Sequence, residues 1–180
     1  MGVRHRGREL AFQILFQTDQ TGDKVNAVIA RFQDMRHANA DAAAFAEDLA
    51  VGAFKAIEEI DGLIRSAAQN WKLERLLSVD RALLRLGVYE LSKRPEIPAE
   101  VTLDECIELA KTYGSDESAA FVNGVLDTLA RQLRPNDGDD TDLPSFKAKA
   151  KGVAKAPKAP RVPKPAIRSH AIPKKKVKKG

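Results

Sequence analysis

Apolar residues recur every three or four positions in one segment after another, from the N-terminus to Pro135. This spacing places them on one face of an α-helix, whereas a half-buried strand needs strict alternation of apolar and polar residues. No segment shows such alternation between turn residues, and only 6% of the residues are aromatic. The pattern therefore predicts an all-α protein, built as a compact bundle of about six or seven helices.

The expected helices are separated by polar stretches, glycine and proline. They cover about residues 4–18, 25–36, 41–70, 78–94, 102–113 and 118–133, with a short apolar segment at 71–77. The helix over 78–94 carries apolar residues around most of its circumference, so we expect it to be central and buried. Gly52 or Gly62 is expected to interrupt the long third helix, because glycine inside a helix is unfavourable.

Three residues are expected to mark helix ends. Ser78 is an expected N-cap, because its hydroxyl can accept a hydrogen bond from a free backbone N–H group. Thr102 and Glu105 have the spacing of a capping box at the start of the next helix. Gly114 is expected to end that helix in a left-handed conformation.

Charge divides the chain at Pro135. Residues 1–135 hold 17 Lys and Arg against 21 Asp and Glu, a formal charge of −4, whereas residues 136–180 hold 13 against 4, or +9. The second segment is rich in Lys, Ala and Pro, so we expect a helical domain at 1–135 and a disordered basic tail at 136–180. Clustered lysines bind phosphate, so the tail either holds nucleic acid without sequence preference or only keeps the protein soluble.

Nothing in the sequence indicates catalysis, a cofactor or a metal site. The single cysteine, Cys106, lies on an amphipathic helix, as expected for a packing residue. His5, His37 and His170 are too scattered to give a zinc-binding spacing. The chain has no phosphate-binding glycine-rich loop and no hydrolase motif. It also has no apolar run near the roughly 20 residues of a membrane helix, and we expect a cytoplasmic protein that is not an enzyme.

Two local features are unfavourable for a helix and therefore point to function. Arg4, His5, Arg6 and Arg8 stand at the start of the first helix, where positive charge opposes the helix dipole. An RNA phosphate backbone would relieve this, although a basic terminus that aids solubility explains it equally well. Gly124 stands in the middle of the last helix, and the nearby Phe121 is either a core residue or a surface on which a base stacks.

Three ordered segments resemble the NusB family. Residues 4–19 read RHRGRELAFQILFQTD, residues 79–98 read VDRALLRLGVYELSKRPEIP, and residues 104–135 read DECIELAKTYGSDESAAFVNGVLDTLARQLRP. They are similar to the family's arginine-rich first helix, to its "YEL" helix followed by a proline turn, and to its "EAIELAK" and "FVNGVLD" elements. The resemblance spans residues 3–135.

The resemblance implies an all-helical transcription antitermination factor. Such a factor would bind boxA, a single-stranded element of ribosomal RNA leader transcripts, together with NusE, a small-subunit ribosomal protein. It would help assemble an antitermination complex on RNA polymerase. Carried over by position, the residues that would contact RNA are Arg4, His5, Arg6, Arg8, Glu117, Phe121 and Asn123, and those that would face NusE are Phe16 and Asp80. An acidic body suits a basic ribosomal partner.

The sequence departs from the family pattern in three places, and it leaves other interpretations open. Phe16 stands where family members often have Tyr, and Ala120 stands where a basic residue can occur. His5 and Gly7 alternate with the arginines where the family pattern leads us to expect an unbroken arginine run. One alternative is an accessory RNA-binding domain of a ribosomal RNA methyltransferase, but no glycine-rich cofactor loop supports it. Another is a nucleoid-type protein that binds nucleic acid non-specifically through the tail. A homodimer formed through the NusE-facing surface is also possible.

Overall fold

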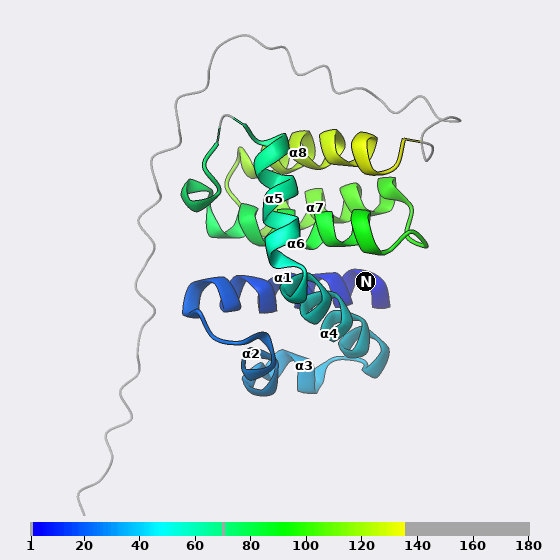
Figure 1. The fold of residues 1–180 in the computed structure, drawn as a ribbon. Coiled ribbons are helices and arrows are strands. Elements are labelled where there is room, and N and C mark those ends of the chain that lie inside the picture. The colour runs from blue at the N-terminus through cyan, green and yellow to red at the C-terminus, as the bar shows by residue number, and fades with distance from the viewer. Residues whose placement is uncertain (1, 70, 136–180) are drawn as a thin grey trace, which may run out of the picture. The chain divides into compact units, whose positions relative to one another are not determined.

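The computed structural model describes residues 2–69 and 71–135, and the expected tail at 136–180 lies outside them. The described residues form eight α-helices and one 3-10 helix, with no strand, which confirms the all-α prediction (Figure 1). In chain order these are α1 (Val3–Thr21), α2 (Val25–Arg31), α3 (Gln33–His37), α4 (Ala40–Lys55), α5 (Ile57–Ala67), η1 (Leu73–Arg75), α6 (Ser78–Lys93), α7 (Ala99–Tyr113) and α8 (Ser118–Leu133). None of the described helices is long and apolar enough to cross a membrane.

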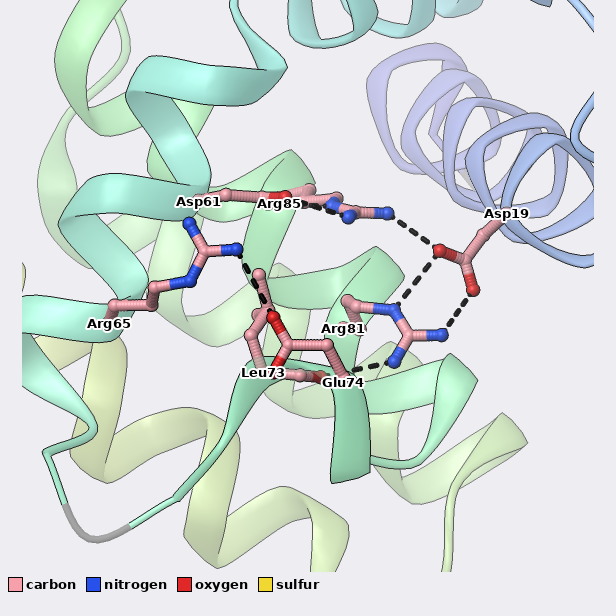
Figure 2. Close-up of a pocket in the computed structure, with 7 residues that line it drawn as sticks. All are labelled: Asp19, Asp61, Arg65, Leu73, Glu74, Arg81 and Arg85. Atoms are coloured by element: carbon pink, nitrogen blue, oxygen red, sulfur yellow. Dashed lines mark hydrogen bonds and ion pairs between the residues drawn. The ribbon is translucent and has the colours of Figure 1, made fainter.

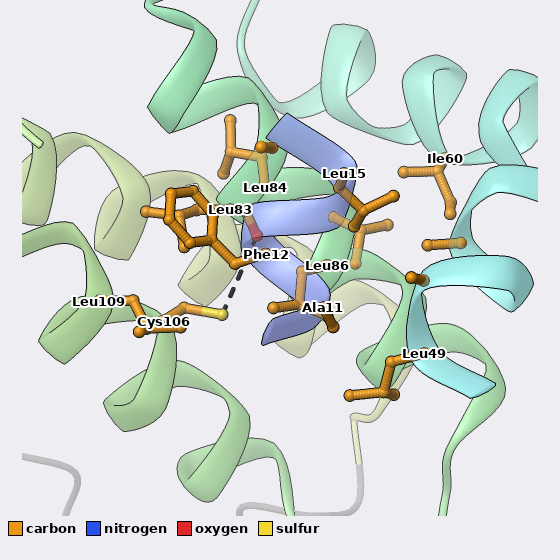
Figure 3. Packing of buried hydrophobic residues seen from close by; sticks show 14 of the residues in the cluster. Ala11, Phe12, Leu15, Leu49, Ile60, Leu83, Leu84, Leu86, Cys106 and Leu109 are labelled. Atoms are coloured by element: carbon orange, nitrogen blue, oxygen red, sulfur yellow. Dashed lines mark hydrogen bonds between the residues drawn. The ribbon is translucent and has the colours of Figure 1, made fainter. Parts of the chain in front are cut away.

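Helix α6 is the centre of the bundle, as its apolar circumference predicts. It packs against α1, α4, α5, α7 and α8, and Leu83, Leu84 and Leu86 on it are fully buried. Side chains from α1, α4 and α7 meet these leucines in one continuous core (Figure 3). Burial of this shared apolar surface holds the helices together, at roughly 25 cal/mol for each Å² removed from water.

Two of the expected helices are each divided in the structure, which explains why there are eight helices and not six or seven. The second expected helix ends at Phe32, whose extended backbone separates α2 from α3. The third ends at Ala56 and not at either glycine. This break lets α4 pack against α1 while α5 packs against α6 and α8. Gly52 lies inside α4, where a Cβ atom would collide with the side chain of Tyr89.

The predicted caps at Ser78 and Thr102 are wrong, whereas α7 does end at Gly114, although not in the left-handed conformation expected. Ser78 is the first residue of α6 and makes no capping bond at its start. Helix α7 begins at Ala99, so Thr102 lies inside it and donates a hydrogen bond to the buried carboxylate of Glu90 (3.1 Å). Gly114 is extended, with φ −91° and ψ −168°. The Ser118 side chain lies where a Cβ atom of Gly114 would be, so close packing, and not a left-handed turn, explains this glycine.

The directions of α1, α6 and α8 determine where the predicted site residues lie. Asp19, near the end of α1, pairs with Arg81 near the start of α6, and Arg8, near the start of α1, pairs with Glu90 near the end of α6, so these two helices are antiparallel. Arg134 follows α8 and donates to the carbonyl oxygen of Glu90, near the end of α6, so α8 runs along α6 in the same direction. We call the two ends of this group the Asp80 end and the Glu90 end. At 1.5 Å per residue they lie about 15 Å apart.

Candidate nucleic-acid interface

Arg8, one of the predicted RNA contacts, lies inside the bundle. Its side chain is only 3% exposed, and its guanidinium donates to both carboxylate oxygens of Glu90, at 2.8 and 3.0 Å. Glu90 is fully buried and accepts a further hydrogen bond from Thr102. The predicted contact between Arg8 and RNA does not fit this burial, because a strand outside cannot reach a guanidinium enclosed by α1, α6 and α7.

Arg4 is the exposed arginine of the N-terminal group. Its guanidinium carbon lies 4.2 Å from the ring centre of Phe45 on α4, and that of Arg8 lies 5.5 Å from the same ring. A cation held over an aromatic ring is stabilised by the ring's quadrupole and loses mobility. Within the described part of the chain Arg4 forms no ion pair with a carboxylate, so its charge is available to a phosphate.

The other two residues of the N-terminal group, Arg6 and His5, already have acidic partners. Arg6 pairs with Glu9 at 2.5 Å and lies 3.9 Å from Asp34, and His5 lies 2.8 Å from Glu105. Burial would raise the pKa of Glu9, but hydrogen bonds from Tyr113 and Arg6 outweigh this and lower it. The N-terminal group is therefore less positive than the sequence suggests.

The second predicted group lies on α8 and on the turn before it. Glu117 is exposed at the N-cap position, and Phe121 and Asn123 are half-buried. Phe121 packs against the core on one side. On its other side it meets Trp71, with ring centres 5.7 Å apart and planes at 68°. Trp71 is 37% exposed, and it was not among the RNA-binding residues predicted from the sequence.

The structure does not bring these two groups together. Arg4, His5 and Arg6 lie at the Glu90 end, because Arg8 of the same helix turn pairs with Glu90. The start of α8 lies at the Asp80 end, where Ser118 approaches Asp80. Figure 1 shows the N-terminus of α1 and the start of α8 toward opposite sides of the molecule. A single RNA strand that touches both groups must run along the bundle.

The two residues expected to face NusE are placed differently from each other. Phe16 is half-buried at the edge of the core, with its ring centre 6.2 Å from that of Phe12. Asp80 is only 5% exposed, and its Oδ1 atom has no hydrogen-bond partner among the described residues. Burial raises the pKa of Asp80, and the Ser118 side chain offsets this only in part. The burial leaves Asp80 little surface for the expected direct contact.

A network of arginines and carboxylates lies at the Asp80 end and was not predicted from the sequence. Asp19 accepts hydrogen bonds from Arg81 (2.5 Å) and Arg85 (2.8 Å), and Arg85 also binds Asp61 (2.8 Å) (Figure 2). Burial would raise the pKa of Asp19, but the two arginines lower it below its usual value. The charges are matched within the network, which joins α1, α5 and α6 around a cavity of about 350 Å³. In the sequence, this network could have been suspected from Arg81 and Arg85, because residues four positions apart lie on the same face of a helix.

The structure assigns Cys106 a packing role. Its thiol is buried, lies 3.9 Å from the carbonyl oxygen of Leu83, and has a pKa raised by burial (Figure 3). A thiol that stays protonated in the core is a poor nucleophile and a poor metal ligand. Over residues 2–69 and 71–135, no three His, Cys, Asp or Glu side chains are grouped as a metal would require.

Comparison with known proteins connects these features to a family. The model of the NusB family matches residues 5–131. The chain is 47% identical to the transcription antitermination protein NusB of Sorangium cellulosum over 139 residues, which are 77% of this chain and 99% of that protein. It is 38% identical to the solved structure of T. maritima NusB, with a TM-score of 0.67 and coverage of 72% and 91% of the two chains.

A third relative is a chain in the crystal structure of the antitermination factors NusB and NusE in complex with double-stranded RNA. It is 30% identical, with a TM-score of 0.67, and the match covers 73% of this chain and 98% of that chain. The likeness extends over the helical body and is supported by sequence and by structure independently. The chain therefore belongs to the NusB family.

Proposed function

We propose that this protein is a transcription antitermination factor. It binds the single-stranded boxA element of ribosomal RNA leader transcripts together with NusE, and it helps assemble an antitermination complex on RNA polymerase. The observation that supports this most strongly is the match to the NusB family over almost the whole helical body, residues 5–131. We further propose that it works in the cytoplasm and without catalysis.

The residues proposed to meet RNA form two patches. At the Glu90 end, the N-terminal patch consists of Arg4, His5 and Arg6, with Arg4 as its freest charge. At the Asp80 end, the α8 patch consists of Glu117, Phe121 and Asn123. Arg8 acts indirectly, by fixing the first turns of α1 through Glu90. The boxA strand would run between the patches.

The proposed NusE surface lies near Phe16. The half-buried ring of Phe16 offers apolar contact area, and the acidic body attracts a basic protein. Asp80 would support this region from inside the bundle. The same surface could also allow self-association when NusE is absent.

Competition binding with the full-length chain tests the proposed function. Labelled boxA RNA is displaced by unlabelled boxA RNA or by a scrambled strand of the same composition, with and without NusE, at moderate ionic strength. We expect boxA to compete better than the scrambled strand, and NusE to increase the difference. Equal competition by the two strands in both conditions would contradict the proposal.

The charge of +9 on residues 136–180 favours a second candidate, non-specific nucleic-acid binding by the tail. This candidate predicts equal affinity for boxA RNA, scrambled RNA and duplex DNA. It also predicts that a chain ending at Pro135 loses all binding. The antitermination proposal predicts instead that the shortened chain, mixed with NusE, still prefers boxA.

A further inference from the structure

Trp71 is the only tryptophan of the chain, and it is exposed. It lies between α5 and η1, on the segment that leads into α6. Tryptophan is highly buried on average, so an exposed indole ring is informative. Its one ring partner among the described residues is Phe121, which belongs to the α8 patch.

The geometry of the two rings leaves stacking surface open. They meet edge to face, with planes at 68°, so neither ring lies flat over a face of the other. Phe121 is fixed by the core behind it, and it supports Trp71 in turn. Aromatic rings of this kind stack well on unpaired RNA bases, because every base has a flat π-face.

Gly124 provides a second, independent observation beside this pair. It lies three residues after Phe121 on α8, so the two positions are neighbours on the helix surface. A Cβ atom at Gly124 would meet no atom within 4 Å, whereas one at Gly87 would collide with Leu126. Internal packing therefore explains Gly87 but neither Gly124 nor Gly62 of α5, and of these two only Gly124 lies beside the ring pair. A glycine that weakens a helix without helping its packing fits a site where another backbone approaches closely.

The charges around the rings fit a nucleotide. Lys72 and Arg75 are exposed on the same short segment as Trp71 and can meet phosphates. Glu117 is exposed one helical turn before Phe121, and a carboxylate accepts hydrogen bonds from the amino groups of bases. Exposed aromatic rings with cations and a carboxylate close by in the chain suit an unpaired base better than an apolar peptide.

We propose that Trp71 and Phe121 form a stacking platform for one unpaired RNA base, with the RNA backbone passing over Gly124. The phosphates on either side of that base lie near Lys72 and Arg75. This inference rests on the proposed function, because it assigns part of the boxA strand to the Asp80 end of the bundle. It adds Trp71, Lys72, Arg75 and Gly124 to the residues that contact RNA.

The single tryptophan allows a direct test. The full-length chain is titrated with boxA RNA while tryptophan fluorescence and the anisotropy of the labelled RNA are recorded, with a Trp71→Phe chain as the blank. We expect the fluorescence to be quenched in parallel with binding. Binding that is seen by anisotropy but leaves the fluorescence unchanged would overturn the platform and leave the proposed function intact.

Variants and modified RNA measure how much stacking on Trp71 contributes to the affinity for boxA. A stacked base is worth about 1–3 kcal/mol, so Trp71→Ala should raise the Kd for boxA about 5- to 140-fold. Trp71→Phe should raise it less. One abasic nucleotide in the RNA should reproduce the loss, and Trp71→Ala should then add nothing further. Additive losses at every abasic position would argue against stacking on Trp71.

Gly124→Ala has a matched control in Gly62→Ala, because a Cβ atom at Gly62 of α5 also meets no atom within 4 Å. Both changes should raise the melting temperature, but only Gly124→Ala should weaken RNA binding. Equal RNA binding by the two variants would contradict a close approach of the RNA backbone to Gly124. If the unaltered chain with NusE shows no preference for boxA, the proposed function fails and the platform fails with it.

Discussion

Arg8 and Glu90 form an ion pair with three hydrogen bonds in the core, although they lie 82 positions apart in the chain. The pair joins the first turns of α1 to the last turns of α6, and Thr102 adds a bond from α7. It therefore sets the position of the exposed residues around it, Arg4 and Arg6.

Arg8→Ala should destabilise the protein strongly. The change leaves the buried carboxylate of Glu90 without its cation, which typically costs about 3–5 kcal/mol. Urea unfolding measures the loss. Replacing both partners by apolar residues, Arg8→Met with Glu90→Leu, should restore most of the stability, because no unpaired charge is left. A stable Arg8→Ala protein that only fails to bind RNA would show that Arg8 faces the strand.

The salt dependence of RNA binding should report on Arg4 and Arg6. Each phosphate contact contributes about 0.7 to the log–log salt slope for a single strand, so Arg4→Ala with Arg6→Ala should flatten the slope by about 1.4. Arg31→Ala, which removes an exposed cation outside both patches, serves as the control and should keep the original slope. A slope that does not change when Arg4 and Arg6 are replaced would assign them no phosphate contact.

Asp80→Asn should stabilise the protein at neutral pH by about 1 kcal/mol. Burial raises the pKa of Asp80, so the folded state disfavours its charged form. The stability that protonated Asp80 contributes is fully present below pH 3.8, the usual pKa of an aspartate. It is lost as the pH rises through the higher pKa of the folded state. The advantage of Asn should therefore be largest at neutral pH and vanish in acid. Thermal unfolding across this range measures it, and a less stable Asn variant at pH 7 would refute the argument.

Asp19→Asn should have the opposite pH dependence. The pKa of Asp19 is lowered in the folded protein, so its pairing with Arg81 and Arg85 stabilises the fold above pH 3.8. This contribution is lost as the pH falls through the lower pKa. We expect the free energy of unfolding to fall by roughly 1–3 kcal/mol at pH 7. In strong acid the variant and the unaltered chain should differ less. Asp23→Asn is a control, since that exposed pair with Arg31 should matter little.

Local patterns predicted the helices well because apolar spacing is a property of neighbouring residues. Helix α8 begins and ends where its apolar face does, and α6 is buried as its circumference indicates. The break at Ala56 could not be predicted, because it depends on which helices α4 and α5 pack against. Thr102 was mistaken for a cap because its real partner, Glu90, belongs to a different helix.

The candidate site was harder to predict than the fold. Arg4 and Arg8 are the same residue type on one helix face, and only the distant Glu90 separates an exposed cation from a buried one. The exposure of Trp71 depends likewise on how its segment lies against α8. Sequence can indicate which residue types are available for RNA, whereas tertiary packing decides which of them reach the surface.

The internal pairing of two N-terminal arginines has a consequence for selectivity inside the cell. Arg6 is matched by Glu9, and Arg8 by Glu90, so the body offers little general attraction to polyanions. Abundant transfer and messenger RNA would then compete weakly for it. A helical body with such a low background remains available for the few transcripts whose bases fit its surface, at the cost of needing a second protein to hold them firmly.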